Sequence, residues 1–161
     1  MTEATAGSRR LPRWTIRCGR SLGVAATVGA LAFATACGGD ATGPNANTPE
    51  GTYAISTVNG KTPPVAIFNE PDYILEVTSG SLVLTRDGKY SAVLTTRQTV
   101  PDNTSIFVDS TSGTWLLSGS AVQFTDASDG AQETATWGNG QLTFSETDGK
   151  VTTTLVYTRK N

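Results

Sequence analysis

The sequence contains no histidine, and this absence removes several kinds of chemistry. Serine and cysteine nucleophiles in hydrolases usually depend on a histidine base, so catalytic triads are not expected. Metal sites built on imidazole are excluded too. Residues 126–130 superficially resemble a calcium loop but lack its later glutamate and ligand spacing, and a turn explains their Asp and Gly better. We therefore predict no metal and no other cofactor.

Cysteine and positive charge are both scarce in most of the chain. Cys18 and Cys37 are the only cysteines, and five arginines lie in the first twenty residues, at positions 9, 10, 13, 17 and 20. From Cys37 onward, seven Lys and Arg stand against thirteen Asp and Glu, which gives this part a net charge of −6. Nucleic-acid-binding domains are typically basic, so no nucleic acid partner is expected.

The N-terminal region lacks a hydrophobic run long enough for a membrane-spanning helix. Its uncharged stretch, residues 21–36, has sixteen residues rich in Ala, Gly and Thr, whereas a spanning helix needs about 20. A basic start, a short uncharged middle and small residues before Cys37 are the pattern of a secretory signal peptide. We predict that residues 1–36 are a signal peptide that is removed.

The junction Ala34-Thr35-Ala36-Cys37 resembles the lipobox of bacterial lipoproteins. This resemblance implies cleavage before Cys37, a diacylglyceryl group on its sulfur and acylation of its amine by a fatty acid such as palmitate. Gly38 after the cysteine implies an outer-membrane lipoprotein facing the periplasm if the source has two membranes, and otherwise an exported protein anchored to the cell membrane. Residues 38–50 have no aliphatic side chain larger than alanine, so residues 37–50 are predicted to be a lipidated cysteine and a disordered tether.

Helical periodicity is missing beyond residue 50, where period-two alternation and turns rich in Gly, Asn and Asp predict strands. Ser79-Gly80 is predicted to be one of the turns, and residues 61–72 are predicted to form a loop with one helical turn at Ala66 to Asn69. In the strand 89–97, Tyr90, Ala92 and Leu94 should point inward. Separate strands are expected at 106–108 and 113–117.

These short strands predict an all-β domain over residues 51–161. The expected fold is an antiparallel up-and-down meander that closes into a small eight-stranded barrel, with a sandwich as the alternative. Tight turns favour the barrel, because a Greek-key sandwich needs longer connections.

Three features resemble the small lipocalin-like domains of bacterial envelope lipoproteins: Gly51-Thr52-Tyr53, the Asn59-Gly60 turn followed by Pro63-Pro64, and Gly113-Thr114-Trp115. A META-like domain is the near alternative. Lipocalins carry Trp where Tyr53 stands here, and the cysteine pairs and arginine layout of larger lipocalins are missing. The resemblance implies a barrel that binds a small hydrophobic ligand.

The aromatic residues supply the candidate ligand site. Those predicted to line the interior are Tyr53, Tyr90, Trp115 and Trp137, although in an eight-stranded barrel such side chains can equally fill the core. The alternative function is a structural or protein-interaction module of the cell envelope, with an exposed apolar patch that includes Phe107, Leu116 and Val156. A carboxylate-dependent glycan-active enzyme using Glu70 and Asp72, or Asp126 and Asp129, is a remote alternative. The protein is predicted not to be an enzyme.

Overall fold

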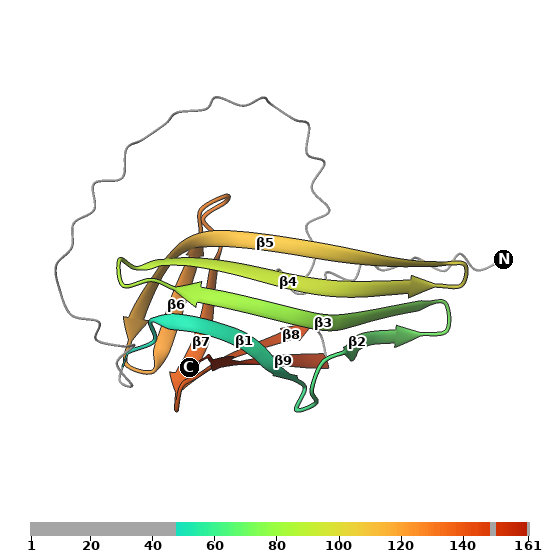
Figure 1. The fold of residues 1–161 in the computed structure, drawn as a ribbon, viewed down its shortest axis with the longest axis horizontal. Coiled ribbons are helices and arrows are strands. Elements are labelled where there is room, and N and C mark those ends of the chain that lie inside the picture. Colours follow the sequence, from blue (N-terminus) through green and yellow to red (C-terminus); the bar gives the residue numbers. More distant parts are fainter. Residues whose placement is uncertain (1–47, 149–150, 161) are drawn as a thin grey trace, which may run out of the picture.

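Alternating residues build nine antiparallel strands in the computed structural model, which describes residues 48–148 and 151–160 (Figure 1). The predicted signal peptide and the lipidation residue Cys37 lie outside the described residues. No helix in the described part of the chain is long and apolar enough to span a membrane. The strands are β1 (Gly51–Val58), β2 (Val65–Glu70), β3 (Tyr73–Leu84), β4 (Lys89–Val100), β5 (Asn103–Ser118), β6 (Ala121–Asp126), β7 (Gln132–Gly138), β8 (Gln141–Asp148) and β9 (Val151–Arg159).

The pairing of β1 closes the sheet into a barrel. From β3 to β9 every strand pairs with the next one along the chain, and β1 pairs with β9 on one side and with the second half of β3 on the other. Eight strands therefore form a closed up-and-down barrel, which confirms the predicted all-β fold and rules out the sandwich. The ninth strand, β2, lies outside the barrel and pairs with the first half of β3.

Three local predictions were wrong because they treated each segment in isolation. Val65–Glu70 is the strand β2 and not a turn of helix, since it adds to the edge that β3 offers beyond β1. β3 runs through Ser79-Gly80 without turning, with only an irregularity in its pairing with β4 between Val77 and Ser79. The segments 106–108 and 113–117 are one strand, β5, which pairs along its length with β4.

Glycine at positions 80 and 113 serves close packing within strands. A Cβ on Gly80 would lie 2.9 Å from the Tyr157 hydroxyl, and a Cβ on Gly113 would lie 2.0 Å from the backbone oxygen of Thr125. Both glycines therefore let another part of the barrel approach the backbone, which is a recognised role of glycine inside strands.

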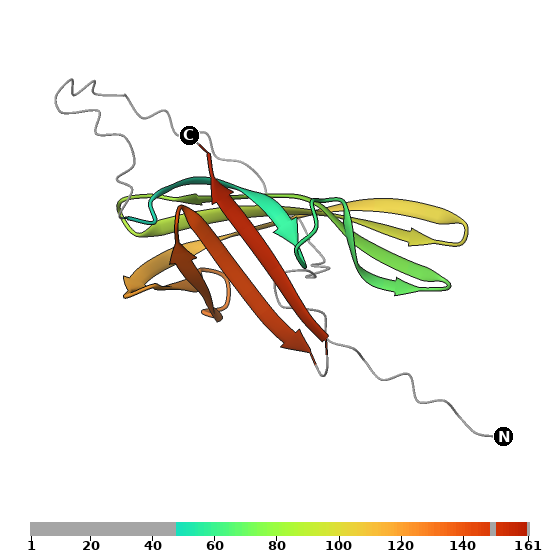
Figure 2. The ribbon, with the colours of Figure 1, turned by 90° about the horizontal axis from the view of Figure 1, so that it is seen from below.

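The two ends of the barrel are covered differently. At one end, here called the closed end, short turns join β3 to β4, β5 to β6 and β7 to β8, and residues 48–50 lie against β9 and the β3–β4 turn. Pro49 is fully buried there, so residues 48–50 pack as part of the folded unit. At the opposite end, the β2–β3 and β4–β5 hairpins project well beyond the other strands (Figure 2).

Candidate functional site

A line of aromatic side chains crosses the barrel interior. The ring of Tyr90 on β4 meets Phe124 on β6 edge to face at 5.1 Å between centroids, and Phe124 lies 5.4 Å from Phe144 on β8. Phe144 in turn meets Tyr157 on β9 edge to face at 5.7 Å. All four rings are at most 5 % exposed, so they fill the middle of the barrel as core residues.

Two glutamates occupy inward positions beside this aromatic line. Glu133 on β7 pairs with Phe124 across the β6–β7 ladder. Glu146 on β8 lies two residues after Phe144, on the same face. Phe144 pairs with Ala135, which lies two residues after Glu133 on β7. Because residues two apart share a face of a strand, both carboxyl groups point to the interior, toward the end opposite the closed end.

A third inward carboxyl group, that of Asp109, lies on β5. Asp109 pairs with Leu94 on β4, and Leu94 is buried, so Asp109 shares its inward face. Asp109 lies four residues beyond the last β5–β6 register pair, Gly113 with Asp126, so it is separate from the two glutamates. We call Glu133 and Glu146 the acidic cluster.

Burial changes the protonation of Glu133. Removal from solvent, with a smaller contribution from the charge of Glu146, raises the pKa of Glu133 from its ordinary value near 4.5 to about 8. Burial also raises the pKa of Asp109. At neutral pH Glu133 is therefore mostly protonated, which is how a protein avoids the cost of an unpaired charge in its interior.

The hydroxyl of Tyr157 is buried and has no hydrogen-bond partner among the described residues. It lies over Gly80 and Leu94, the residues that continue across the sheet to Asp109. Its pKa is raised by burial and, to a lesser extent, by the charge of Glu133. By contrast, the hydroxyl of Tyr90 accepts a hydrogen bond from Thr111 at 3.3 Å. A buried hydroxyl without a partner is costly, and such groups in folded proteins call for an explanation.

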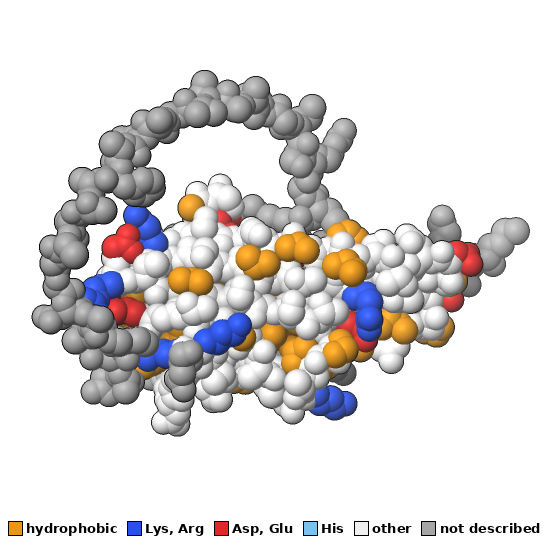
Figure 3. Space-filling model, viewed as in Figure 1, with side chains coloured by type: hydrophobic (Ala, Val, Ile, Leu, Met, Phe, Trp, Pro, Cys, Tyr) orange, Lys and Arg blue, Asp and Glu red, His pale blue; other side chains and the backbone are white. Residues whose placement is uncertain are grey.

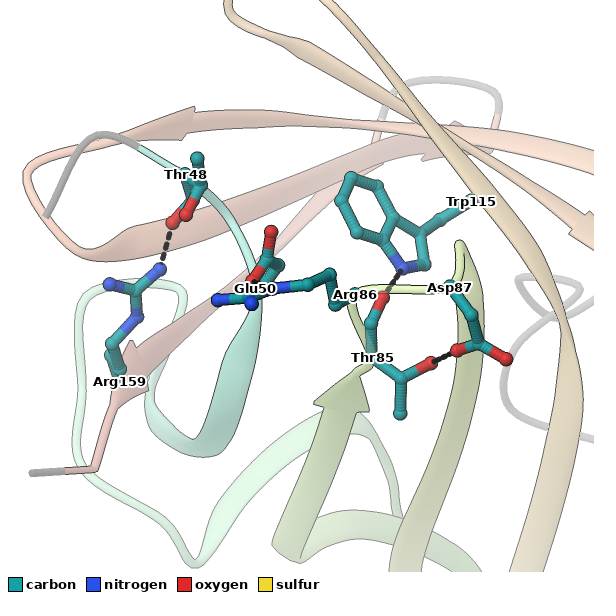
Figure 4. Close-up of polar contacts among 7 residues, drawn as sticks. All are labelled: Thr48, Glu50, Thr85, Arg86, Asp87, Trp115 and Arg159. Atoms are coloured by element: carbon teal, nitrogen blue, oxygen red, sulfur yellow. Dashed lines mark hydrogen bonds and ion pairs between the residues drawn. The ribbon is translucent and has the colours of Figure 1, made fainter. Parts of the chain in front are cut away.

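The predicted lining residue Tyr53 lies at the closed end instead of near the acidic cluster. It is fully buried, donates a 2.6 Å hydrogen bond to the carbonyl of Pro49 and accepts one from Arg159 at 3.1 Å. The guanidinium of Arg159 also lies over the Tyr53 ring. It donates a hydrogen bond to the carbonyl of Thr48 (Figure 4). Tyr53 thus anchors residues 48–50 across the closed end.

The other three predicted lining residues lie at different depths. Tyr90 belongs to the aromatic line beside the acidic cluster. Trp115 is partly buried, and its indole nitrogen donates to the carbonyl of Thr85 in the β3–β4 turn at the closed end (Figure 4). Trp137 packs against the core from β7, and its indole nitrogen is buried without a partner. The structure therefore brings Tyr90 to the acidic cluster and leaves Tyr53 and Trp115 at the closed end.

The exposed apolar surface differs from the predicted patch. Phe107 and Leu116 lie on opposite faces of β5, and Val156 is a half-buried residue of β9, so these three do not form one patch. The exposed apolar side chains on the outer face of β4 and β5 are Val93, Ile106, Val108 and Leu116. Figure 3 shows hydrophobic side chains as separate spots among other side chains on the face that carries β3, β4 and β5.

The acidic residues that the sequence offered as catalytic carboxylates have other roles. Glu70 and Asp72 are exposed around the β2–β3 turn. Asp126 accepts hydrogen bonds from the backbone and side chain of Ser128, and Asp129 accepts one from the backbone of Ala131. These contacts build the β6–β7 turn. Sequence reasoning missed Glu133 and Glu146, although each lies at an inward position of an alternating strand, where an acidic residue is unusual.

Among residues 48–148 and 151–160, no three His, Cys, Asp or Glu side chains are grouped as a metal ion would require. The chain matches no protein-family model, and neither the curated proteins nor the solved structures that were compared with it contain a similar protein.

Proposed function

We propose that this protein is a lipid-anchored lipoprotein of the bacterial cell envelope whose barrel binds a small, mainly apolar molecule. The observation that carries the ligand-binding part is the Tyr157 hydroxyl, which is buried without a hydrogen-bond partner among the described residues, together with the inward positions of Glu133 and Glu146. An interior built only for stability would not keep such groups, because each costs free energy that an apolar side chain would avoid. An eight-stranded barrel has a size that side chains can fill or that can hold one small ligand.

The anchoring part is supported by the N-terminal sequence. A basic region, an uncharged stretch of sixteen residues and the lipobox-like Ala34-Thr35-Ala36-Cys37 precede the barrel. Each buried CH₂ of an attached acyl chain contributes about 0.8 kcal/mol, and stable anchoring usually takes more than one chain. A lipidated Cys37 would supply two or three chains on a single residue.

Native mass spectrometry of the mature protein, extracted from its own membrane in mild detergent, tests the ligand-binding part. We expect a population heavier than the acylated chain by the mass of one small molecule, and this extra mass should disappear when the protein is unfolded. A bare acylated chain under the mildest activation would overturn the proposal. A bare chain that co-purifies with a protein partner would favour an interaction module instead.

Fractionation of cells that express Cys37→Ser tests the anchoring part. We expect this variant to move from the membrane to the soluble fraction and to lose incorporation of labelled palmitate. Cys18→Ser is the matched control, because Cys18 lies in the predicted signal peptide and should change neither result. Membrane residence of the Cys37→Ser chain at the level of the unmodified protein would overturn the lipoprotein assignment.

An interaction module of the envelope is the second candidate function. Ile106 and Val108, at 69 % and 63 % exposed, lie on the outer face of the long β4–β5 hairpin that projects past the barrel. Exposed apolar side chains on a projecting sheet are a common feature of protein contacts. Charged replacements at both positions should abolish co-purification of a partner if this function holds.

We propose a binding role in preference to a catalytic one. Glycan hydrolysis needs two carboxyl groups on either side of a bound sugar chain. The two inward glutamates lie inside a barrel only wide enough for side chains or one small ligand, so a polysaccharide could not pass between them.

A further inference from the structure

The first part of β5 is an open edge of the sheet. β5 pairs with β4 from Asn103 to Thr114, but its pairing with β6 begins only at Gly113. Over residues 103–112, no strand of the described part of the chain pairs with the side of β5 that faces away from β4 (Figure 1). We call residues 103–112 the β5 edge. Such an edge is a template on which another strand can add.

The backbone groups that face away from β4 belong to the even-numbered residues of β5. The N–H of Trp115 bonds the carbonyl of Gly88 next to β4, and the carbonyl of Ser112 accepts from Ala127 on the other side. Because the β4–β5 register is continuous, hydrogen bonds to β4 alternate along β5, and every second residue points its N–H and C=O to the open side. Beyond Ser112 these residues are Thr104, Ile106, Val108 and Ser110.

The β5 edge has few of the features by which proteins protect an open strand. Residues 103–112 contain no Pro, Gly, Lys or Arg, and their pairing with β4 has no bulge. Their one charged side chain, Asp109, points to the inner face. The other open edge of the sheet, β2, has six residues and an irregular register between Ala66 and Phe68. Shortness and bulges discourage pairing, so the β5 edge is the better template.

The sequence of the β5 edge is complementary to itself around Phe107. In an antiparallel pair of two β5 edges with Phe107 opposite the partner's Phe107, Ile106 lies opposite the partner's Val108. These two side chains are exposed on the outer face, at 69 % and 63 %, so each would cover the other. A shift of two residues would place Val108 opposite a threonine or a serine and break up this apolar contact.

The same register satisfies the backbone and the one charge. It makes hydrogen-bonded pairs of Ile106 with the partner's Val108 and of Thr104 with the partner's Ser110, and the symmetry repeats both. Each such pair exchanges two N–H···O=C bonds, which gives about eight in total. Asp109 lies opposite the partner's Ser105, a hydroxyl donor, so the two carboxyl groups are not opposed.

We propose that this protein forms a twofold symmetric dimer in which the β5 edge pairs antiparallel with the β5 edge of a second copy, centred on Phe107. Strands β2 to β5 of both copies then form one continuous sheet. A twofold contact uses the same edge of each copy, so assembly ends at the dimer. The inference goes beyond the proposed function and holds whether or not the barrel binds a ligand.

Sedimentation of the full chain with Cys37→Ser, which removes any lipid at this position, tests the dimer. We expect a dimer at concentrations on the order of 10 μM. Ile106→Lys combined with Val108→Lys should weaken dimerisation at least about tenfold, because like charges then lie opposite each other. Leu116→Lys is the matched control, since Leu116 is 66 % exposed on the same outer face but lies where β5 already pairs with β6.

Two results of this measurement would overturn the inference. One is equal weakening by the double substitution and by Leu116→Lys. The other is a monomer at about 100 μM, which would leave the β5 edge to an extended segment of a different protein.

Disulfide cross-linking tests the register, in a chain that also carries Cys18→Ser and Cys37→Ser so that the introduced thiol is the only one. Phe107→Cys should cross-link under mild oxidation, because opposite residues of a non-hydrogen-bonded pair have Cα atoms about 4.5 Å apart, within the reach of a disulfide. Ser105→Cys is the control, since its counterpart would lie four residues away along the strand, about 13 Å. Equal yields, no cross-link at position 107, or assemblies larger than a dimer would overturn the proposed pairing.

Discussion

The guanidinium of Arg159 lies 5.5 Å from the centre of the Tyr53 ring and also donates a hydrogen bond to the Tyr53 hydroxyl. The first and last strands of the barrel meet through this contact, since the two residues are register partners in the β1–β9 ladder. The Tyr53 hydroxyl also donates a hydrogen bond to the carbonyl of Pro49, which is fully buried. A single tyrosine thus connects the closing strands of the barrel with the segment that leads to the predicted tether.

Tyr53→Phe should destabilise the protein by about 1–3 kcal/mol. The substitution keeps the ring but leaves the buried carbonyl of Pro49 without its donor, and an unsatisfied buried acceptor costs about that much. Urea unfolding measures the change. Tyr73→Phe is the control, because Tyr73 is only partly buried on β3 and its variant should remain within about 0.5 kcal/mol of the unmodified protein. Equal effects of the two substitutions would contradict the role assigned to the Pro49 contact.

Gly113→Ala should destabilise the barrel by more than about 3 kcal/mol or prevent folding. The new Cβ would lie 2.0 Å from the backbone oxygen of Thr125, and a strand backbone cannot move away without breaking the β5–β6 ladder. Gly138→Ala is the matched control, since no heavy atom lies within 4 Å of its added Cβ. Circular dichroism and urea unfolding compare the two variants, and a Gly113→Ala protein as stable as Gly138→Ala would refute the close approach.

Local alternation was enough to predict most of the barrel. Tyr90, Ala92 and Leu94 were assigned to the inward face from spacing alone, and all three are buried. Tight turns predicted the meander, and closure followed because an eight-strand meander can bury its edges only by joining them. The wrong predictions of a turn at Gly80 and of a separate strand beginning at Gly113 have one cause. Each glycine is required by a partner on another strand, and strand pairing is not visible in the local sequence.

The candidate site was harder to predict than the fold. Aromatic residues were correctly expected to face inward, but only Tyr90 of the four named residues lies beside the acidic cluster. Glu133 and Glu146 look like ordinary surface residues of a Thr-rich strand when each is considered alone. Their burial depends on which neighbours cover them, and the pKa of Glu133 depends on both burial and Glu146. These are tertiary properties that spacing does not determine.

Tyr157→Phe should stabilise the unliganded protein by about 1 kcal/mol. The substitution removes a buried hydroxyl that has no partner and keeps the ring contact with Phe144. Urea unfolding measures the change. A loss of stability as large as that of Tyr53→Phe would show that the Tyr157 hydroxyl has a structural partner and is not part of a ligand site.

The stability of the protein should fall as pH rises from 5 to 8. The folded protein holds the Glu133 proton up to about pH 8, whereas the unfolded chain releases it near pH 4.5. The folded state therefore binds more protons in this window, and the free energy of unfolding falls by up to about 1.4 kcal/mol per pH unit. Because the carboxyl group is only partly buried, we expect about half of that slope.

Glu133→Gln isolates this contribution, since glutamine has nearly the shape of the protonated acid and does not titrate. The variant should match the unmodified protein at pH 5 and exceed its stability by about 2 kcal/mol at pH 8, where the unmodified protein must either carry a buried charge or hold a proton against its tendency to dissociate. Urea unfolding at pH 5, 6.5 and 8 measures the difference, with Asp102→Asn as the exposed control. A difference that is constant across the three pH values would mean that Glu133 titrates normally in the folded protein.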